Sequence, residues 1–242
     1  MSELTGVLAL VGGAEWREGC RKFDAALLEA AGTVEVLVLP TAAAFENPKR
    51  SVDFARRYFE DLGGRVTGLM ALGRTEADDE ANARIVRDAR FVYIGGGSPL
   101  HLRSVLKGSR LWEALLEGWR DGAVLAASSA GAMVLCDPMV DPRGGAYTVG
   151  LGLLANLSVF PHHDTAPAHL RERSVELRPE GATLVGLDEQ TALIRDPEGS
   201  WRVAGLGVAT LYGPAAREVG TYGPDSAVSV LGTGSPATPA PR

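Results

Sequence analysis

The residues best suited to chemistry surround Ser129, where an apolar stretch typical of a buried strand gives way to small residues. A nucleophilic serine needs such a place, because a tight turn from strand to helix presents the hydroxyl with no bulky neighbour beside it. The usual spacing is Gly-x-Ser-x-Gly, and Ser129 fits it with Ala127 in the first glycine position and Gly131 in the second. Ser128 fits less well, because Ala130 stands where it would need glycine. The alternative is a tightly packed junction without chemistry.

A serine hydroxyl becomes a good nucleophile only when a base takes its proton, and histidine suits that role near neutral pH. Four histidines are candidates: His101, His162, His163 and His169. His162 and His163 are favoured, because they follow the apolar run 157–160 and therefore lie where a strand meets a loop. Position alone does not separate these two. For His101 and His169, which lie in predicted helices, an exposed helix face is the simpler interpretation.

The base needs an acidic partner that orients it. Asp188 and Glu189 come at the end of the apolar run 183–187, whereas Asp137 and Asp141 lie in a proline-rich segment that favours turns. Placement at a strand end favours the later pair.

Glycine-rich backbone near the serine predicts an oxyanion hole. The amides of Gly95-Gly96-Gly97 could approach a substrate carbonyl because no side chain blocks them, and the N–H of Ala130 follows the nucleophile. We therefore predict oxyanion donors at Gly96 and Ala130. The alternatives are a plain turn or a phosphate cradle, but the lysine of a P-loop and the spacing of a dinucleotide fingerprint are both missing.

The elements that would position these residues alternate between strand and helix. Strands are predicted at 7–11, 34–39, 66–72, 91–94 and directly before Ser129, and helices at 23–31, 49–62, 76–89 and 99–119, the last broken near Gly108. Strands that are apolar on both faces and alternate with helices predict an α/β fold with a doubly wound, mostly parallel sheet and flanking helices. Such sheets bind ligands beyond the carboxyl ends of their strands. We expect Gly12-Gly13, Gly95-Gly96-Gly97 and Ser129 to line one crevice there.

After about residue 133, prolines, glycines and short strands predict a β-rich C-terminal part. With 242 residues, of which 45% are hydrophobic, the chain suits a single domain over 1–231, followed by a flexible tail at 232–242. A net charge of −6 without a Lys/Arg cluster argues against nucleic acid or an anionic membrane as partner. Cys20 and Cys136 are too few for a disulfide framework and lack metal-ligand spacing, so buried thiols are expected. No signal peptide or apolar span is recognised, which predicts a cytoplasmic protein.

Short motifs follow one another in a characteristic order between Val7 and about Leu211: Gly12-Gly13-Ala14-Glu15, Tyr93-Ile-Gly-Gly-Gly97, Ser129-Ala-Gly-Ala132, Gly150-Leu-Gly-Leu-Leu154, Pro161-His162, Gly186-Leu-Asp-Glu189 and Gly205-Leu-Gly-Val208. In this order they resemble the serine peptidase family of dipeptidase E (aspartyl dipeptidase) and cyanophycinase. The resemblance implies a class I glutamine amidotransferase-like fold, a flavodoxin-like three-layer sandwich. It also implies that Ser129 is the nucleophile, His162 the base and Glu189 the acidic partner. Amidotransferases of this fold use cysteine at the turn, so a serine favours amide hydrolysis.

The resemblance bears on the substrate as well. Cyanophycinases carry Asp-Gln before the catalytic histidine and an arginine-rich segment after it, whereas this chain has Phe160-Pro161 before and His163-Asp164-Thr165 after. That difference argues against cyanophycin. In the dipeptidase branch, an arginine in an Arg-Glu context binds the aspartyl carboxylate of the substrate. Arg171 matches that context and Arg173 is an equal candidate, with a solvated helix face as the alternative for both.

Three further residues are expected to contact substrate: Gly97, Ser98, which stands where relatives often have Asn or Asp, and His163. The leading hypothesis is a serine exopeptidase for short peptides, with an aspartyl dipeptidase as its specific form and no metal or other cofactor. The alternatives are a cyanophycinase-like β-aspartyl peptide hydrolase and a catalytically silent binding protein on the same fold. The expected partner is a short peptide, with no nucleic acid and no membrane; a homodimer is allowed, although the sequence does not fix the oligomeric state.

Overall fold

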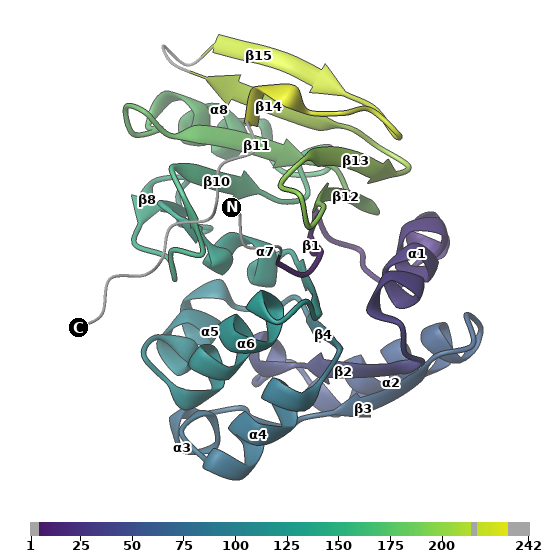
Figure 1. Ribbon diagram of the computed structural model, residues 1–242. Helices are drawn as coiled ribbons and strands as arrows, with labels where there is room; N and C mark the ends of the chain where they lie inside the picture. Colours follow the sequence, from purple (N-terminus) through teal and green to yellow (C-terminus); the bar gives the residue numbers. More distant parts are fainter. Residues whose placement is uncertain (1–4, 214–216, 232–242) are drawn as a thin grey trace.

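Two β-sheets form the framework of the computed structural model, which describes residues 5–213 and 217–231 (Figure 1). The first sheet has seven strands in the order β13-β12-β1-β5-β4-β2-β3. Their bounds are β1 Leu8–Val11, β2 Glu35–Leu39, β3 Arg65–Gly68, β4 Phe91–Ile94, β5 Val124–Ser128, β12 Thr191–Arg195 and β13 Trp201–Gly205. β1, β5, β4, β2 and β3 pair in parallel, while β12 is antiparallel to both β1 and β13. The predicted mostly parallel α/β fold is confirmed.

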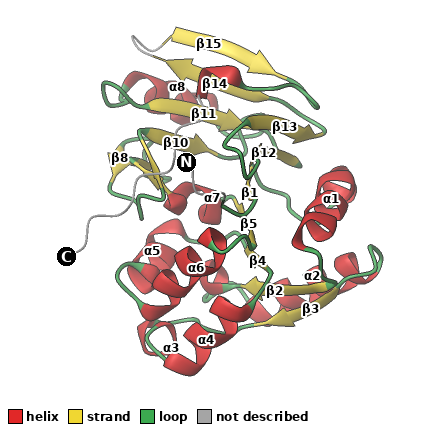
Figure 2. Cartoon of the chain, viewed as in Figure 1, coloured by secondary structure: helices red, strands yellow, loops and turns green. Residues whose placement is uncertain are grey.

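Helices cover both faces of this sheet (Figure 2). Their bounds are α1 Arg21–Ala31, α2 Pro48–Glu60, α3 Arg74–Ala77, α4 Glu80–Asp88, α5 Pro99–Leu106, α6 Arg110–Arg120, α7 Ala130–Leu135 and α8 Ala168–Glu176. Side chains alternate along β1, so Leu8 and Leu10 pack into the core with α4, α5 and α6. Ala9 and Val11 pack into the opposite core with α1 and α2. Burial on both faces explains why the strands are apolar throughout.

The second sheet makes up most of the C-terminal part and has six strands in the order β15-β14-β11-β10-β6-β9. Their bounds are β6 Cys136–Asp137, β9 Leu154–Ala155, β10 Leu157–Phe160, β11 Thr183–Leu187, β14 Ala209–Gly213 and β15 Arg217–Tyr222. A separate hairpin pairs β7 Met139–Val140 with β8 Tyr147–Thr148, and short 3-10 turns lie at Glu18–Cys20, Thr41–Ala43 and Ser229–Leu231. The chain passes from β11 in this sheet directly into β12 in the first. The predicted tail at 232–242 lies outside the described residues.

Two predicted elements differ in the structure. The strand expected at 66–72 ends at Gly68, where an added Cβ would lie 2.6 Å from a methyl group of Val52 on α2. The helix expected at 76–89 is divided into α3 and α4, because the Asp79 side chain accepts the backbone N–H of Ala81 and caps a new helix. The predicted break at Gly108 is confirmed, with a φ of 63°.

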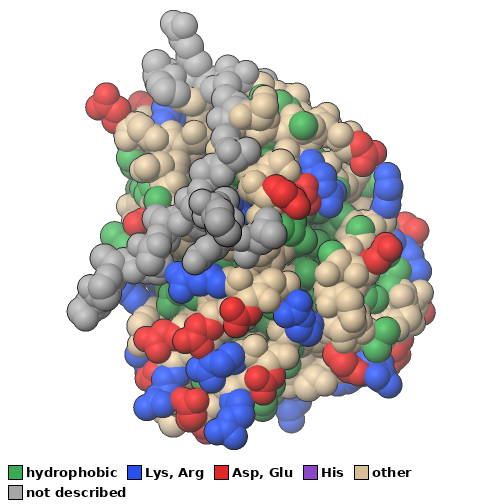
Figure 3. All heavy atoms as spheres, viewed as in Figure 1, with side chains coloured by type: hydrophobic (Ala, Val, Ile, Leu, Met, Phe, Trp, Pro, Cys, Tyr) green, Lys and Arg blue, Asp and Glu red, His purple; other side chains and the backbone are tan. Residues whose placement is uncertain are grey.

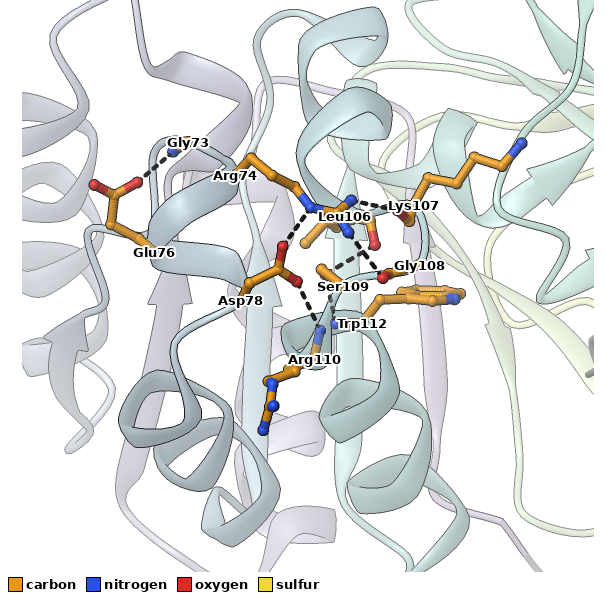
Figure 4. Close-up of polar contacts among 10 residues, drawn as sticks. All are labelled: Gly73, Arg74, Glu76, Asp78, Leu106, Lys107, Gly108, Ser109, Arg110 and Trp112. Carbon is orange, nitrogen blue, oxygen red and sulfur yellow. Dashed lines mark hydrogen bonds and ion pairs between the residues drawn. The ribbon is translucent and has the colours of Figure 1, made fainter. Parts of the chain in front are cut away.

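Hydrogen bonds from Arg74 hold together the corner between α3, α5 and α6 (Figure 4). Its Nε donates to Asp78 at 2.6 Å, and its terminal nitrogens donate to the carbonyls of Lys107 and Gly108. Asp78 also accepts the backbone N–H of Arg110. Because every branch of this guanidinium has an acceptor within the protein, its role is to join elements. Within residues 5–213 and 217–231, no helix combines the length and apolar content that crossing a bilayer requires.

Candidate active site

Ser129 occupies a sharp turn between β5 and α7. Its backbone has φ 48° and ψ −108°, a region that non-glycine residues rarely adopt, and its N–H donates to the carbonyl of Val11 at 2.9 Å. Two residues on, a Cβ at Gly131 would lie 3.0 Å from the carbonyl oxygen of Ile94 and 3.2 Å from the Cβ of Ala127. Close packing therefore explains the small residues, and the turn has the geometry of a nucleophile elbow.

Three side chains from distant parts of the chain meet at this turn. Ser129 Oγ lies 3.0 Å from His162 Nε2, and His162 Nδ1 lies 2.8 Å from Glu189 Oε1. With a proton on Nδ1, the imidazole donates to the carboxylate and accepts from the serine hydroxyl, which is the arrangement of a general base. The His162 and Glu189 side chains are 39% and 31% exposed, so a substrate can reach them.

The turn after β1 holds the loops that carry His162 and Glu189. The carbonyl of Gly12 accepts the N–H of His162 at 2.7 Å, and the carbonyl of Gly13 accepts the N–H of Gln190 at 2.9 Å. Gly13 has a φ of 120°, and a Cβ there would lie 2.2 Å from His162 Cε1. The imidazole therefore lies directly against the glycine backbone, where no other residue would leave it room.

His163 points away from the serine, into the second sheet. Its Nε2 lies 2.9 Å from the Tyr212 hydroxyl, and its ring packs against Gly186, where a Cβ would lie 2.3 Å from Cδ2. Burial lowers the pKa of His163, and the charge of Arg171 adds to this effect, while Asp188 opposes it. His163 is 9% exposed and does not line the cleft that contains Ser129. The structure thus gives it a packing role in place of the expected substrate contact.

The other base and acid candidates lie elsewhere. The Nε2 of His101 lies 2.9 Å from the Leu72 carbonyl, while Asp141 pairs with Arg143 and Asp137 accepts the N–H of Gly150. None of the three polar side chains lines the cleft that contains Ser129. The Ser129 hydroxyl bonds to His162 instead.

Glu15 links the glycine turn to the elbow. Its Oε1 accepts the N–H of Gly96 at 3.0 Å, and its Oε2 accepts the hydroxyl of Ser128 at 2.8 Å. Ser128 is fully buried. The amide of Gly96, expected as an oxyanion donor, is thus already bonded to a carboxylate. Ala130 is the first residue of α7, where the backbone N–H has no acceptor within the helix.

A cleft of about 700 Å³ opens beside Ser129 and His162. Gly97 lines it with a φ of 136°, and a Cβ there would lie 2.4 Å from the carbonyl oxygen of Ala42. Ser98 instead caps α5, since its Oγ accepts the N–H of His101. Neither Arg171 nor Arg173 lines the cleft, and a guanidinium nitrogen of Arg171 donates to the His163 carbonyl at 3.0 Å.

Charged side chains that were not predicted from the sequence also line the cleft. Arg17 follows the turn after β1, and Arg50, Phe54 and Arg57 come from α2. The spacing i, i+4, i+7 places the three α2 residues on one helix face, which is a signal that the sequence contains. Glu15 belongs to the motif Gly12-Gly13-Ala14-Glu15, but the sequence alone predicts no role for its side chain.

Comparison with known proteins decides the family. The model of peptidase family S51 matches residues 8–200. The chain belongs to peptidase family S51. It is therefore a hydrolase of the serine-peptidase type, and the resemblance drawn from the motifs is confirmed.

Relatives of this S51 peptidase include curated cyanophycinases. That of Synechococcus elongatus is 24% identical over 220 residues, which cover 86% of this chain and 68% of the relative. That of Trichormus variabilis is 26% identical over 221 residues, with 87% and 74% covered. Among solved structures, a peptidase from an acI-B1 Actinobacterium is 28% identical with a TM-score of 0.84, over 94% of this chain and 98% of that one. A putative peptidase E protein from Listeria monocytogenes EGD-e, 18% identical with a TM-score of 0.64, covers 84% of this chain and 100% of its own length and shares the fold.

Proposed function

We propose that this S51 peptidase hydrolyses short peptides as an exopeptidase through Ser129, His162 and Glu189. The observation that carries the proposal is the continuous chain of contacts, 3.0 Å from Ser129 Oγ to His162 Nε2 and 2.8 Å from His162 Nδ1 to Glu189 Oε1. Both distances lie within hydrogen-bond reach, as nucleophile, base and orienting acid require.

In the first half-reaction, Ser129 Oγ bonds to the scissile carbonyl carbon while His162 takes the hydroxyl proton. Collapse of the tetrahedral intermediate breaks the C–N bond, and the imidazolium gives its proton to the leaving amine. In the second half, water attacks the carbonyl carbon of the acyl-enzyme while His162 accepts a proton from that water. The bond between the acyl carbon and Ser129 Oγ then breaks, and the imidazolium returns the proton to Oγ. Glu189 stabilises the imidazolium in both halves.

The oxyanion is assigned first to the N–H of Ala130, which follows the nucleophile and begins α7. Gly96 contributes a second donor when the substrate oxygen replaces Glu15 as the acceptor of its N–H. Glu15 then remains bonded to Ser128 and keeps the glycine turn next to the elbow.

The specific form that we propose is an aspartyl dipeptidase-like enzyme. The second candidate is a cyanophycinase-like β-aspartyl peptide hydrolase, which the names of the relatives at 24% and 26% identity favour. The absence of Asp-Gln before His162 weighs against it.

A panel of dipeptides together with β-Asp-Arg polymer separates these candidates. We expect hydrolysis of some dipeptides by the wild-type protein and none by Ser129→Ala. Release of β-Asp-Arg would favour the second candidate. A fluorophosphonate probe should label the wild type and not Ser129→Ala, and failure to label the wild type would favour a silent binding protein.

A further inference from the structure

Three arginines line the cleft that also contains the proposed catalytic serine. Arg50 and Arg57 lie two helical turns apart on α2, and Arg17 follows the turn after β1. All three are exposed side chains. The same cleft is lined by Ser129 and His162, so a molecule bound to the serine would extend past these cations.

These arginines have no carboxylate partner within residues 5–213 and 217–231. Arg56, which directly precedes Arg57 on α2, pairs with Asp53 at 2.5 Å and does not line the cleft. Arg21, on the neighbouring helix, lies 4.0 Å from both Glu18 and Asp61. Unpaired like charges that line one cleft repel each other, so their presence in the cleft of Ser129 points to an anion that binds there.

An aromatic ring holds one of the cations in place. The guanidinium carbon of Arg17 lies 4.8 Å from the centroid of the Phe54 ring. Cation–π attraction of this kind holds the guanidinium over the ring face, while its N–H groups can still bind a carboxylate. Because Phe54 stands between Arg50 and Arg57 on the same helix face, the three cations form one surface, which we call the arginine wall.

The acidic residues of the cleft do not neutralise the arginine wall. Both carboxylate oxygens of Glu15 accept bonds from neutral donors, Gly96 and Ser128. In the described part of the chain, Glu46 is then the one cleft carboxylate without a bonded partner, against three guanidinium groups.

A second hollow adjoins the cleft of about 700 Å³, which we call the main hollow. The second hollow, of about 290 Å³, shares Arg17, Phe54 and Arg57 with the main hollow and continues towards Arg21 and Tyr58. The carboxylates of Glu18 and Asp61 also line this second hollow, each 4.0 Å from Arg21. The main hollow alone has a volume typical of pockets that bury drug-sized ligands. The two together suit a peptide longer than two residues.

We propose that the arginine wall binds carboxylate side chains of acidic oligopeptides, and that such peptides are the preferred substrates of this site. The proposal rests on the proposed exopeptidase function for short peptides, which it deepens by naming acidic peptides longer than a dipeptide as the preferred substrates, in place of the aspartyl dipeptides of the specific form above. Bidentate carboxylate–guanidinium pairs at Arg50 and Arg57 would align the peptide along α2 with its scissile carbonyl at Ser129.

The test uses pairs of pentapeptides that differ only by Glu or Gln at two positions, each pair made with a free and with an amidated C-terminus. We expect kcat/KM for the Glu peptide to exceed that for the Gln peptide by about tenfold or more. The preference should shrink as ionic strength rises from about 0.01 M to about 0.15 M, because the Debye length falls from about 30 Å to about 8 Å. A preference that persists in the amidated pair assigns it to side chains and not to the terminal carboxylate.

The variants compare Arg50→Gln/Arg57→Gln with Arg56→Gln, the matched control on the same helix. The double variant should lose most of the preference through a higher KM for the Glu peptide, and the control should keep it. Equal hydrolysis of Glu and Gln peptides by the wild type, or an unchanged preference in the double variant, would overturn the proposal while the hydrolase function stands.

A binding measurement keeps the two proposals apart. Titration of fluorescent Glu and Gln peptides into Ser129→Ala reports affinity without turnover. If no peptide is hydrolysed by the wild type, the proposed function fails, and tighter binding of the Glu peptide still supports the arginine wall. Equal binding of the Glu and Gln peptides would overturn the proposal that the arginine wall binds carboxylate side chains.

Discussion

Arginines serve opposite purposes in two regions of this molecule. At the corner of α3, α5 and α6, Arg74 is bonded to a carboxylate and two carbonyls (Figure 4). On the face shown in Figure 3, acidic and basic side chains alternate over this part of the chain. On the arginine wall, Arg50 and Arg57 have no such partners in the described chain. The comparison indicates that bonded guanidinium groups hold elements together, whereas unpaired ones face the space that a ligand would fill.

The comparison predicts that changes at the cleft alter activity and leave stability nearly unchanged. The largest effect is expected for Ser129→Ala, which should lower kcat/KM by about 10³-fold or more, because among the described residues no other hydroxyl bonds to His162. Ser128→Ala is the matched control and should keep most of the activity, since its hydroxyl bonds to Glu15. Kinetics on one peptide, with melting temperatures of both variants, checks this. A reversed order of the two effects would contradict the assignment.

The next effect concerns Glu189. Glu189→Gln keeps the shape of the side chain but removes the charge that stabilises the imidazolium, so kcat should fall by about 100-fold or more. KM should change little, because Glu189 faces His162 Nδ1. A variant that retains full kcat would exclude the carboxylate from the mechanism. Asp188→Asn is its control, because Asp188 lies beside His163 and away from the serine.

A buried carboxyl group sharpens the comparison, because it faces neither a cation nor solvent. Burial raises the pKa of Asp24 to about 8, although the Tyr58 hydroxyl, which donates to it at 2.8 Å, lowers the pKa. The folded protein therefore keeps this proton up to about pH 8, whereas the unfolded chain releases it near its ordinary value of 3.8. The contribution of Asp24 to the free energy of unfolding is therefore fully present below about pH 4, and it is lost as pH rises towards 8.

Asp24→Asn removes the titration while keeping the shape of the side chain. We expect the variant to melt higher than the wild type at pH 8, with a smaller difference at pH 5. Thermal unfolding of both proteins across this range measures it. Parallel curves with a constant offset would show that Asp24 does not titrate between the two values.

The smallest effect is expected at the corner. Arg74→Ala removes three hydrogen bonds between elements and should lower the melting temperature by about 2–4 °C. The kcat/KM of the folded enzyme should not change. Arg84→Ala on α4, an exposed position, is the control and should alter neither quantity. A lower kcat/KM in Arg74→Ala under conditions where the variant is fully folded would contradict the distinction between structural and ligand-binding arginines.

The local chemistry of the site could be predicted from sequence, because small residues around Ser129 and strand ends before His162 and Glu189 are local signals. The choice between His162 and His163 could not be made from residue types. It depends on the φ of 52° at His162 and on its contact with Gly13, which lies far away in the chain. The family resemblance supplied that choice.

The fold was predictable for the same local reason, since apolar strands alternate with helices. The division between α3 and α4 was missed although its signal, Asp79 at a helix start, was present. The arginine wall was missed because it forms only when α2 packs beside the turn after β1. From sequence alone, a charged helix face is interpreted as exposed to solvent, because the elements that pack beside it are not known.

The proposed reacting groups are divided between the two sheets. Ser129 directly follows β5 of the first sheet, His162 comes two residues after β10 of the second, and Glu189 lies between β11 and β12, where the chain crosses from the second sheet to the first. The alignment of nucleophile and base is thus a property of how two halves dock. A slip of one half by an ångström would silence the enzyme while both sheets kept their hydrogen bonds, so loss of turnover on warming should precede loss of secondary structure.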